Sequence, residues 1–268
     1  MIESELVQRF ATALPVGSLR CVVVVPCYNE AVRLHTEAFA TFVQSPQCHN
    51  IRLLMVNDGS TDSTLSVLHS LQSRFPESIL VLDQQPNRGK AEAVRSGMLH
   101  AMSLDGCETT GFWDADLATP LEQIPELAAV LERNAALTMV FGARVRLLGR
   151  AIHRRAMRHY LGRCFATAAS MMLRLPIYDT QCGAKLFRVT PELRQVLTEP
   201  FESRWIFDVE LLARFMARHR GEPDAVREQI YEYPLPEWTD VAGSKVRPSD
   251  FFRAFLELLR TYRRFLAG

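Results

Sequence analysis

Short apolar runs alternate with longer amphipathic segments in the first half of the chain. The segments between the runs predict helices that begin near residues 31, 61, 90 and 121. The runs themselves predict buried strands: CVVVVP (21–26), IRLLMVND (51–58), SILVLDQ (78–84), TTGFWDAD (109–116) and ALTMVFGAR (136–144). Strand alternating with helix predicts an α/β fold, a mostly parallel sheet with helices on both faces.

The second half follows a different pattern. It predicts a long helical stretch over 147–175, a helix over 207–219 and a strand over 227–235. The C-terminal segment predicts an amphipathic helix. Its apolar face is expected to carry Phe251, Phe255, Leu258, Leu259, Tyr262 and Leu266, and its other face Arg253, Arg260 and Arg264. Such a helix either docks on its own domain or lies in a membrane interface.

Charge and cysteine content narrow the class of protein. Lys and Arg number 31 against 30 Asp and Glu, so the chain as a whole is no polyanion binder. Residues 133–178, however, contain nine arginines and no Asp or Glu. This local positive charge can attract phosphates or an anionic membrane surface. With few aromatic residues interleaved, this stretch does not favour nucleic acid. The six cysteines lack metal-type spacing and suggest reduced thiols in a cytoplasm.

Two further patterns bear on localisation. The N-terminal segment MIESELVQRF has two glutamates and no apolar core, so it does not predict a signal peptide. No window approaches the roughly 18 apolar residues of a membrane span. We therefore expect a cytoplasmic protein, peripheral at a membrane if it meets one.

Polar clusters follow the predicted strands. They are Tyr28–Asn29–Glu30, Asn57–Asp58–Gly59, Asn87–Arg88–Gly89–Lys90 and Asp114–Ala115–Asp116. Ligands of parallel α/β sheets bind beyond the carboxyl ends of the strands. The four clusters are therefore expected to form one site.

The Asp114–Asp116 pair is the strongest chemical signal. Residues i and i+2 of an extended segment point to the same side, so the two carboxylates can share one cation. Carboxylate oxygens suit Mg²⁺ or Mn²⁺. A solvated turn that caps the next helix is the plain alternative. The aspartyl-phosphate nucleophile of haloacid-dehalogenase-type phosphatases is disfavoured, because their motif has Thr or Val where this chain has Ala118.

The other clusters suggest nucleotide contacts. Asp58 is expected to accept a hydrogen bond from a pyrimidine N–H, and Glu30 to hold a ribose hydroxyl or a base edge. Arg88 and Lys90 flank a glycine at a helix start, an arrangement that binds anions. Neither a Walker A loop nor a G-x-G-x-x-G motif is present, so a P-loop ATPase and a Rossmann dehydrogenase are not indicated.

The motifs together resemble a known family. PCYNE, VNDGSTDST, NRGKAEAVRSGM, DAD, DTQCGAKLF and WIFDVELL occur in this order and resemble family 2 glycosyltransferases of the GT-A fold. The nearest subgroup is the polyprenyl-phosphate hexosyltransferases. The match covers about residues 20–247. It implies one GT-A domain over 1–247, with a nucleotide-sugar half at about 18–145 and an acceptor half at about 146–247, followed by the helix over 248–268.

The resemblance also implies roles for individual residues. The nucleotide sugar is expected at Pro26, Tyr28, Asn29, Glu30, Asp58, Gly59, Lys90, Asp114, Ala115 and Asp116. The metal, Mg²⁺ or Mn²⁺, is expected at Asp114 and Asp116. The acceptor is expected at Arg144, Gln181, Arg204, Trp205, Asp208, Ser244 and Lys245. Catalytic roles are expected for Asp116, Asp179, Arg144 and Lys245, with Asp179 as the base if the acceptor is a sugar hydroxyl.

The motif details favour glucose over mannose. NRGKAEAVRSGM and EWTDVAGSKV look like the glucosyl subgroup, and Ala118 stands where mannosyl enzymes commonly have a metal-binding Gln. The resemblance thus implies an inverting transfer of hexose from UDP-glucose to a polyprenyl or dolichyl phosphate at the cytoplasmic membrane face. The alternatives are a GDP-mannose donor, a soluble or saccharide acceptor, or a nucleotide-sugar-binding protein without turnover. The sequence does not indicate the oligomeric state.

Overall fold

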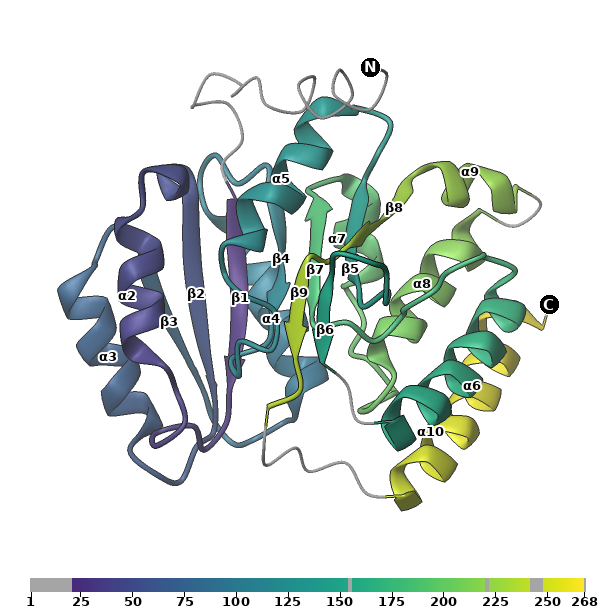
Figure 1. Ribbon diagram of the computed structural model, residues 1–268, viewed down its shortest axis with the longest axis horizontal. Helices are drawn as coiled ribbons and strands as arrows, with labels where there is room; N and C mark the ends of the chain where they lie inside the picture. Colours follow the sequence, from purple (N-terminus) through teal and green to yellow (C-terminus); the bar gives the residue numbers. More distant parts are fainter. Residues whose placement is uncertain (1–20, 154–155, 220–221, 242–247, 268) are drawn as a thin grey trace.

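Seven strands form one central sheet in the order β3-β2-β1-β4-β7-β5-β8 (Figure 1). The computed structural model describes residues 21–153, 156–219, 222–241 and 248–267. The strands of this sheet are β1 (Cys21–Cys27), β2 (Ile51–Asp58), β3 (Ile79–Gln84), β4 (Thr109–Trp113), β5 (Met139–Ala143), β7 (Ala184–Arg188) and β8 (Ile230–Pro234). Each apolar run that predicted a strand forms one, and the α/β class is confirmed.

The strand directions bring one further segment to the carboxyl edge of the sheet. β1 pairs in parallel with β2 and β4, β2 with β3, and β5 with β8. β7 lies between β4 and β5 and is antiparallel to both. The start of β7 therefore lies beside the end of β4, where Asp114 N donates to Gly183 O at 2.9 Å. This places DTQCG next to the paired aspartates.

Alternate residues of the strands face two helical layers. Val22 and Val24 pack with residues of α4 (Lys90–Ser103), α6 (Ala156–Leu173), α7 (Pro191–Val196) and α8 (Phe207–Arg218). Val23 and Val25 pack with α2 (Thr36–Gln44), α3 (Thr64–Arg74) and α5 (Gln123–Arg133) on the other face. Burying each such valine stabilises the fold by about 1.5–3 kcal/mol. Both faces of the sheet are thus covered, as the continuous apolar runs predicted.

Two predicted elements have different boundaries. The start of the predicted helix over 147–175 is wrong, because residues Ala151–His153 form strand β6, which pairs with β9 (Glu237–Thr239) in a small second sheet. Gly149, at φ 79, makes the turn before β6. The start of the predicted strand over 227–235 is also wrong. A short helix, α9 (Pro223–Glu228), takes its first residues, because Pro223 suits the first position of a helix.

The C-terminal segment forms α10 (Pro248–Thr261) and one π-helical turn, η2 (Tyr262–Leu266), against α6 and α8 (Figure 1). Its buried stripe is Ala254, Leu258 and Thr261. The predicted apolar face is therefore only partly correct. Phe255, Leu259 and Tyr262 remain 42%, 56% and 43% exposed, because docking against α6 and α8 selects a stripe rotated toward Ala254.

Two findings concern the whole described chain. All six cysteines are free, in agreement with the reduced thiols that their spacing predicted. Among the residues that the structure describes, no helix combines the length and the apolar character needed to cross a membrane.

Candidate active site

The turn after β1 is joined to the turn after β2 by hydrogen bonds. Asn29, at φ 52, accepts from Thr61 N through Oδ1 at 2.8 Å, and Glu30 N donates to Thr64 Oγ1 at 2.8 Å. The Glu30 carboxylate accepts from the Arg33 guanidinium at 2.9 and 2.5 Å. Tyr28 lies beside them with 38% of its surface exposed. Hydrogen bonds thus join the turn at 28–30 to the turn at 57–64. Arg33 forms an ion pair with Glu30, the residue predicted to bind the ribose.

Asp58 is buried and holds the loop after β3. Its carboxylate accepts from Arg88 N at 2.8 Å, Gly89 N at 2.8 Å and Asn87 Nδ2 at 2.9 Å, and only 2% of the residue is exposed. Asp58 therefore holds the loop after β3, and its contact with a pyrimidine N–H stays a prediction.

Gly59 allows this close approach. Its φ is +63°, and a Cβ built on it would lie 2.3 Å from Asn87 N. The glycine therefore serves both the left-handed turn and the contact between two loops.

The Asp114–Asp116 pair lies on the turn that leaves β4. Trp113 is fully buried and donates from Nε1 to Thr119 O at 2.9 Å, which fixes the start and end of that turn. Ala118 N donates to Asp116 Oδ1 at 3.1 Å. Burial and then the charge of Asp114 raise the pKa of the Asp116 carboxyl. The two acids are therefore close enough to repel each other, as the sequence predicted.

A positive group already lies at this pair. Lys90, the first residue of α4, has its Nζ 2.5 Å from Asp114 Oδ1. Desolvation lowers the pKa of Lys90, but the carboxylates of Asp114, Asp208 and Asp116 outweigh it and raise the pKa. Lys90 is therefore protonated at neutral pH and is the counter-ion of the acids in this state of the protein.

The residues at this turn suit a hard divalent cation. Asp114 Oδ1 is buried and faces the Lys90 ammonium. A Cβ at Gly183 would lie 2.0 Å from Asp114 Oδ2, so the glycine leaves room for the carboxylate. Within the described residues, no cluster of three or more His, Cys, Asp or Glu side chains could hold a metal. The chain thus offers two carboxylates, the number typical where Mg²⁺ takes its other ligands from phosphates and water.

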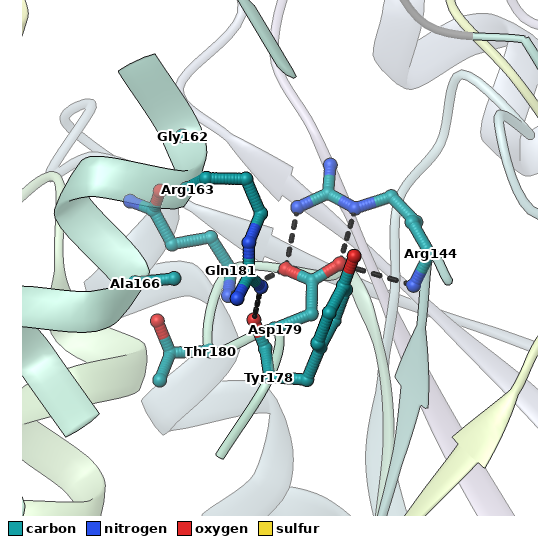
Figure 2. Close-up of a pocket in the computed structure, with 8 residues that line it drawn as sticks. All are labelled: Arg144, Gly162, Arg163, Ala166, Tyr178, Asp179, Thr180 and Gln181. Atoms are coloured by element: carbon teal, nitrogen blue, oxygen red, sulfur yellow. Dashed lines mark hydrogen bonds and ion pairs between the residues drawn. The ribbon is translucent and has the colours of Figure 1, made fainter. Parts of the chain in front are cut away.

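Arg144 and Asp179 form a buried ion pair between the end of β5 and the DTQCG segment. Arg144 Nε and Nη2 donate to the two Asp179 oxygens at 2.6 and 2.7 Å, and Arg144 N donates at 3.1 Å (Figure 2). The Arg144 guanidinium also lies 5.2 Å from the centre of the Trp238 ring. Both Asp179 oxygens accept from a permanently charged guanidinium, which makes the carboxylate a weak base, and its role as general base stays a prediction.

A pocket adjoins this pair, between α6 and the DTQCG segment (Figure 2). Arg163 stacks on the Tyr178 ring at 3.7 Å and donates to Tyr178 O at 2.7 Å. Thr180 and Gln181 also line it, and the Thr180 hydroxyl is buried with no hydrogen-bond partner in the described chain. No sequence signal distinguishes Arg163 from the other arginines of its segment.

A second buried ion pair lies beneath the site. Lys185, on β7 and 1% exposed, donates to Asp208 Oδ1 at 2.6 Å and to Cys182 O at 2.5 Å. The Asp208 carboxylate thus neutralises a buried lysine, and its contact with the acceptor stays a prediction. Sequence reasoning missed Lys185, although a lysine inside the apolar strand pattern AKLF was a visible signal.

The remaining predicted acceptor residues lie away from the ion pairs or outside the described chain. Arg204 and Trp205 are exposed on the loop before α8, where Trp205 N donates to Glu257 Oε2 of α10 at 3.3 Å. Ser244 and Lys245 lie outside the described residues. The other predicted nucleotide residues, Pro26 and Ala115, are at the carboxyl ends of β1 and β4.

This geometry can be compared with known proteins. The model of glycosyl transferase family 2 matches residues 22–192. The chain belongs to this family. It is 32% identical to a dolichyl-phosphate beta-glucosyltransferase of Drosophila melanogaster, over 94% of this chain and 77% of the relative. A Saccharomyces cerevisiae protein of the same name is 30% identical, over 84% of this chain and 68% of the relative. The family 2 chain is accordingly a glycosyltransferase.

Solved structures agree on the fold. A mannosyltransferase from Pyrobaculum calidifontis, in complex with GDP-Man and Mn²⁺, aligns with a TM-score of 0.62 at 18% identity and covers 100% of this chain and 71% of its own. Glucosyl-3-phosphoglycerate synthase from Mycobacterium tuberculosis, with Mn²⁺, UDP-glucose and phosphoglyceric acid, also scores 0.62 at 18% identity, over 91% and 80%. The family 2 chain therefore has the predicted GT-A fold.

Proposed function

We propose that this enzyme transfers glucose from UDP-glucose to a polyprenyl phosphate, with inversion at the anomeric carbon. Its curated relatives in Drosophila and yeast are named dolichyl-phosphate beta-glucosyltransferases, which supports both the hexose and the acceptor class. The bond from the sugar carbon to UDP breaks, and a bond to the acceptor phosphate oxygen forms. The domain division predicted from sequence, a catalytic domain over 1–247 with a helix over 248–268, is part of this proposal.

We assign a divalent cation, Mg²⁺ or Mn²⁺, to Asp114 and Asp116. The desolvated acid pair, the buried Asp114 Oδ1 and the lack of a side chain at Gly183, which leaves room for the Asp114 carboxylate, support this assignment. When bound, the cation acts as a Lewis acid on the leaving diphosphate. Lys90 supplies a further positive charge at the same place, held there by the loop that Asp58 anchors.

The single observation that favours a phosphate acceptor is the pairing of Asp179 with Arg144. A sugar hydroxyl needs a carboxylate to take its proton. A phosphate monoester, with a second pKa near ~6, is already ionised at neutral pH and needs no base. The site therefore suits an acceptor that arrives as an anion.

The pocket of Figure 2 is where we place the acceptor phosphate. Arg163 and Arg144 bring two guanidinium groups to it, and Gln181 adds an amide. The Thr180 hydroxyl lacks a partner in the described chain, and a phosphate oxygen would supply one. In this proposal the side chains of Arg144, Arg163, Thr180 and Gln181 hold the acceptor phosphate by donating hydrogen bonds to it.

We further propose that α10 rests on an anionic membrane surface that presents the acceptor. Phe255, Leu256, Leu259 and Tyr262 form its exposed apolar strip. Arg253 and Arg260 are also exposed on α10, and Arg264, which pairs with Glu202, is exposed on η2. Apolar and cationic residues side by side on one helix suit an interface with acidic lipid. The six free thiols agree with placing this surface on the cytoplasmic side.

The experiment that tests the function is product analysis with purified enzyme, Mn²⁺ and a short polyprenyl phosphate. UDP-glucose, UDP-N-acetylglucosamine and GDP-mannose are offered separately, and the free polyprenol replaces the phosphate in a parallel set. We expect a glucosyl lipid from UDP-glucose and the phosphate only. UDP release at the same rate with polyprenol or with no lipid would move the acceptor to another class.

Two variants distinguish a specific role of the pocket from a general effect of positive charge on acceptor binding. Arg163→Met is expected to raise the KM for polyprenyl phosphate at least tenfold, because it removes a charge-assisted contact. Arg174→Met removes an exposed arginine just beyond the end of α6 and is expected to leave this KM within twofold. Equal effects of the two substitutions would contradict the placement of the phosphate.

A further inference from the structure

The Lys90 ammonium lies on one of the two carboxylates to which we assign the metal. Its Nζ is 2.5 Å from Asp114 Oδ1. A divalent cation bonds carboxylate oxygen at roughly 2.0–2.2 Å. The ammonium and the cation would therefore compete for one carboxylate.

The chain allows Lys90 to move only at its side chain. Its backbone follows Gly89, whose N–H is fixed on the Asp58 carboxylate at 2.8 Å. The Lys90 side chain is 43% exposed, on a flexible four-carbon stem. The ammonium can therefore leave Asp114 without disturbing the loop.

A ligand diphosphate offers the displaced ammonium a new partner. Lys90 begins α4, whose N-terminus attracts anions through its N–H groups and dipole. The nucleotide diphosphate of a sugar donor carries the negative charge that the lysine loses when a metal takes its place on Asp114. Metal and nucleotide thus each remove an obstacle to the binding of the other.

We propose that Lys90 is an internal counter-ion that blocks the metal site until nucleotide arrives, and that its transfer from Asp114 to the diphosphate makes metal and nucleotide bind cooperatively. This inference rests on the proposed metal site at Asp114 and Asp116. Because coupling between two ligands is reciprocal, the metal strengthens nucleotide binding by the same factor. Lys90 thereby weakens the binding of the metal when the nucleotide is absent.

The test measures Mn²⁺ binding directly, by the loss of the free Mn²⁺ signal in electron paramagnetic resonance, with and without UDP. In the wild type, UDP is expected to tighten Mn²⁺ binding at least tenfold. Lys90→Met is expected to bind Mn²⁺ alone roughly tenfold more tightly than the wild type, since one competing charge is gone. In this variant UDP is expected to add less than about threefold.

Three further variants make the result specific. Lys90→Arg keeps the charge and is expected to retain weak binding of Mn²⁺ alone. Arg52→Met removes an exposed cation at the opposite, amino end of β2 and is expected to leave Mn²⁺ affinity unchanged within twofold. Asp114→Asn is expected to lose Mn²⁺ binding in both conditions.

Two results would overturn the proposal, and they differ. If Asp114→Asn loses Mn²⁺ binding but Lys90→Met binds Mn²⁺ alone no more tightly than the wild type, the counter-ion role is wrong and the metal site stands. If Asp114→Asn binds Mn²⁺ like the wild type, both the metal site and the role of Lys90 are wrong.

Discussion

The Arg144 guanidinium donates two hydrogen bonds, of 2.6 and 2.7 Å, to the carboxylate of Asp179, which lies 35 residues later in the sequence. The side chains are only 13% and 7% exposed. Such a pair ties the end of β5 to the segment before β7. It fixes one wall of the pocket in Figure 2, and removal of either partner leaves a buried charge.

Breaking this pair is expected to destabilise the fold strongly. Asp179→Asn should lower the free energy of unfolding by about 3–5 kcal/mol, because the buried Arg144 loses its counter-charge. Arg144→Met should have a similar effect, and the double variant should lose about 1–3 kcal/mol less than the sum. Urea unfolding at pH 7 measures all four proteins. Additivity within about 0.5 kcal/mol would show that the two side chains are not coupled.

Asp58 is expected to behave as a structural anchor of the loop after β3. Asp58→Asn should destabilise the ligand-free enzyme by about 1–3 kcal/mol, because buried N–H groups lose their acceptor. A carboxylate that only contacted a base would leave ligand-free stability unchanged or higher. Asp105→Asn, on an exposed loop, is the control and should stay within about 0.5 kcal/mol.

Gly59 is expected to be intolerant of any side chain. Gly149→Ala is a matched control, since it has a φ of +79° with nothing within 4 Å of the added Cβ. The control should cost about 1–2 kcal/mol for the left-handed backbone alone. Gly59→Ala adds a contact of 2.3 Å to Asn87 N and should cost clearly more. Equal losses in urea unfolding would mean that the two loops separate freely.

Asp116 is expected to make the metal-free enzyme less stable as pH rises. Burial and the charge of Asp114 raise its pKa in the fold, so its contribution is full below the unfolded pKa of about 3.9 and is lost as pH rises through the higher folded value. Asp116→Asn should therefore raise the metal-free Tm at pH 7 by about 2–4 °C. This gain should shrink toward pH 4.

Bound metal and nucleotide should make the wild type more stable than Asp116→Asn, the reverse of the order expected for the metal-free proteins. When Mn²⁺ is added to the UDP-bound enzyme at about 100 times its Kd, the wild type gains about 2.7 kcal/mol from the metal, whereas Asp116→Asn gains far less. Thermal melts at two pH values, with and without ligands, measure both effects. A lower metal-free Tm of the variant at pH 7 would contradict the predicted repulsion.

The exposed strip of α10 is expected to govern vesicle binding. Replacing Leu256 and Leu259 by Ser should weaken sedimentation with phosphatidylserine-containing vesicles at least tenfold, since each buried leucine contributes about 1.5–3 kcal/mol. Tyr231→Ser removes a side chain of similar exposure, 44%, from β8 and should change binding less than twofold. Binding that is unaffected by the Leu256 and Leu259 changes would remove α10 from the interface.

The sequence by itself determined the layers of the fold and the edge at which chemistry occurs. The apolar runs at β1 to β5 and the polar residues after them are local signals, because strand burial depends on consecutive side chains and ligand positions follow strand ends. The ordered motifs from PCYNE to FDVELL likewise sufficed for the family and its fold, which the comparisons confirm.

Only the tertiary structure decided which acidic and basic side chains form ion pairs. Asp179 was predicted as a base and Asp208 as an acceptor contact, but each neutralises a buried cation, Arg144 and Lys185. Lys90 was predicted at the nucleotide, and it lies on Asp114. These partners are 23 to 35 residues apart. Sequence spacing cannot predict such pairs, because a buried charge takes the nearest opposite charge in space, and antiparallel β7 and the loop held by Asp58 determine which one that is.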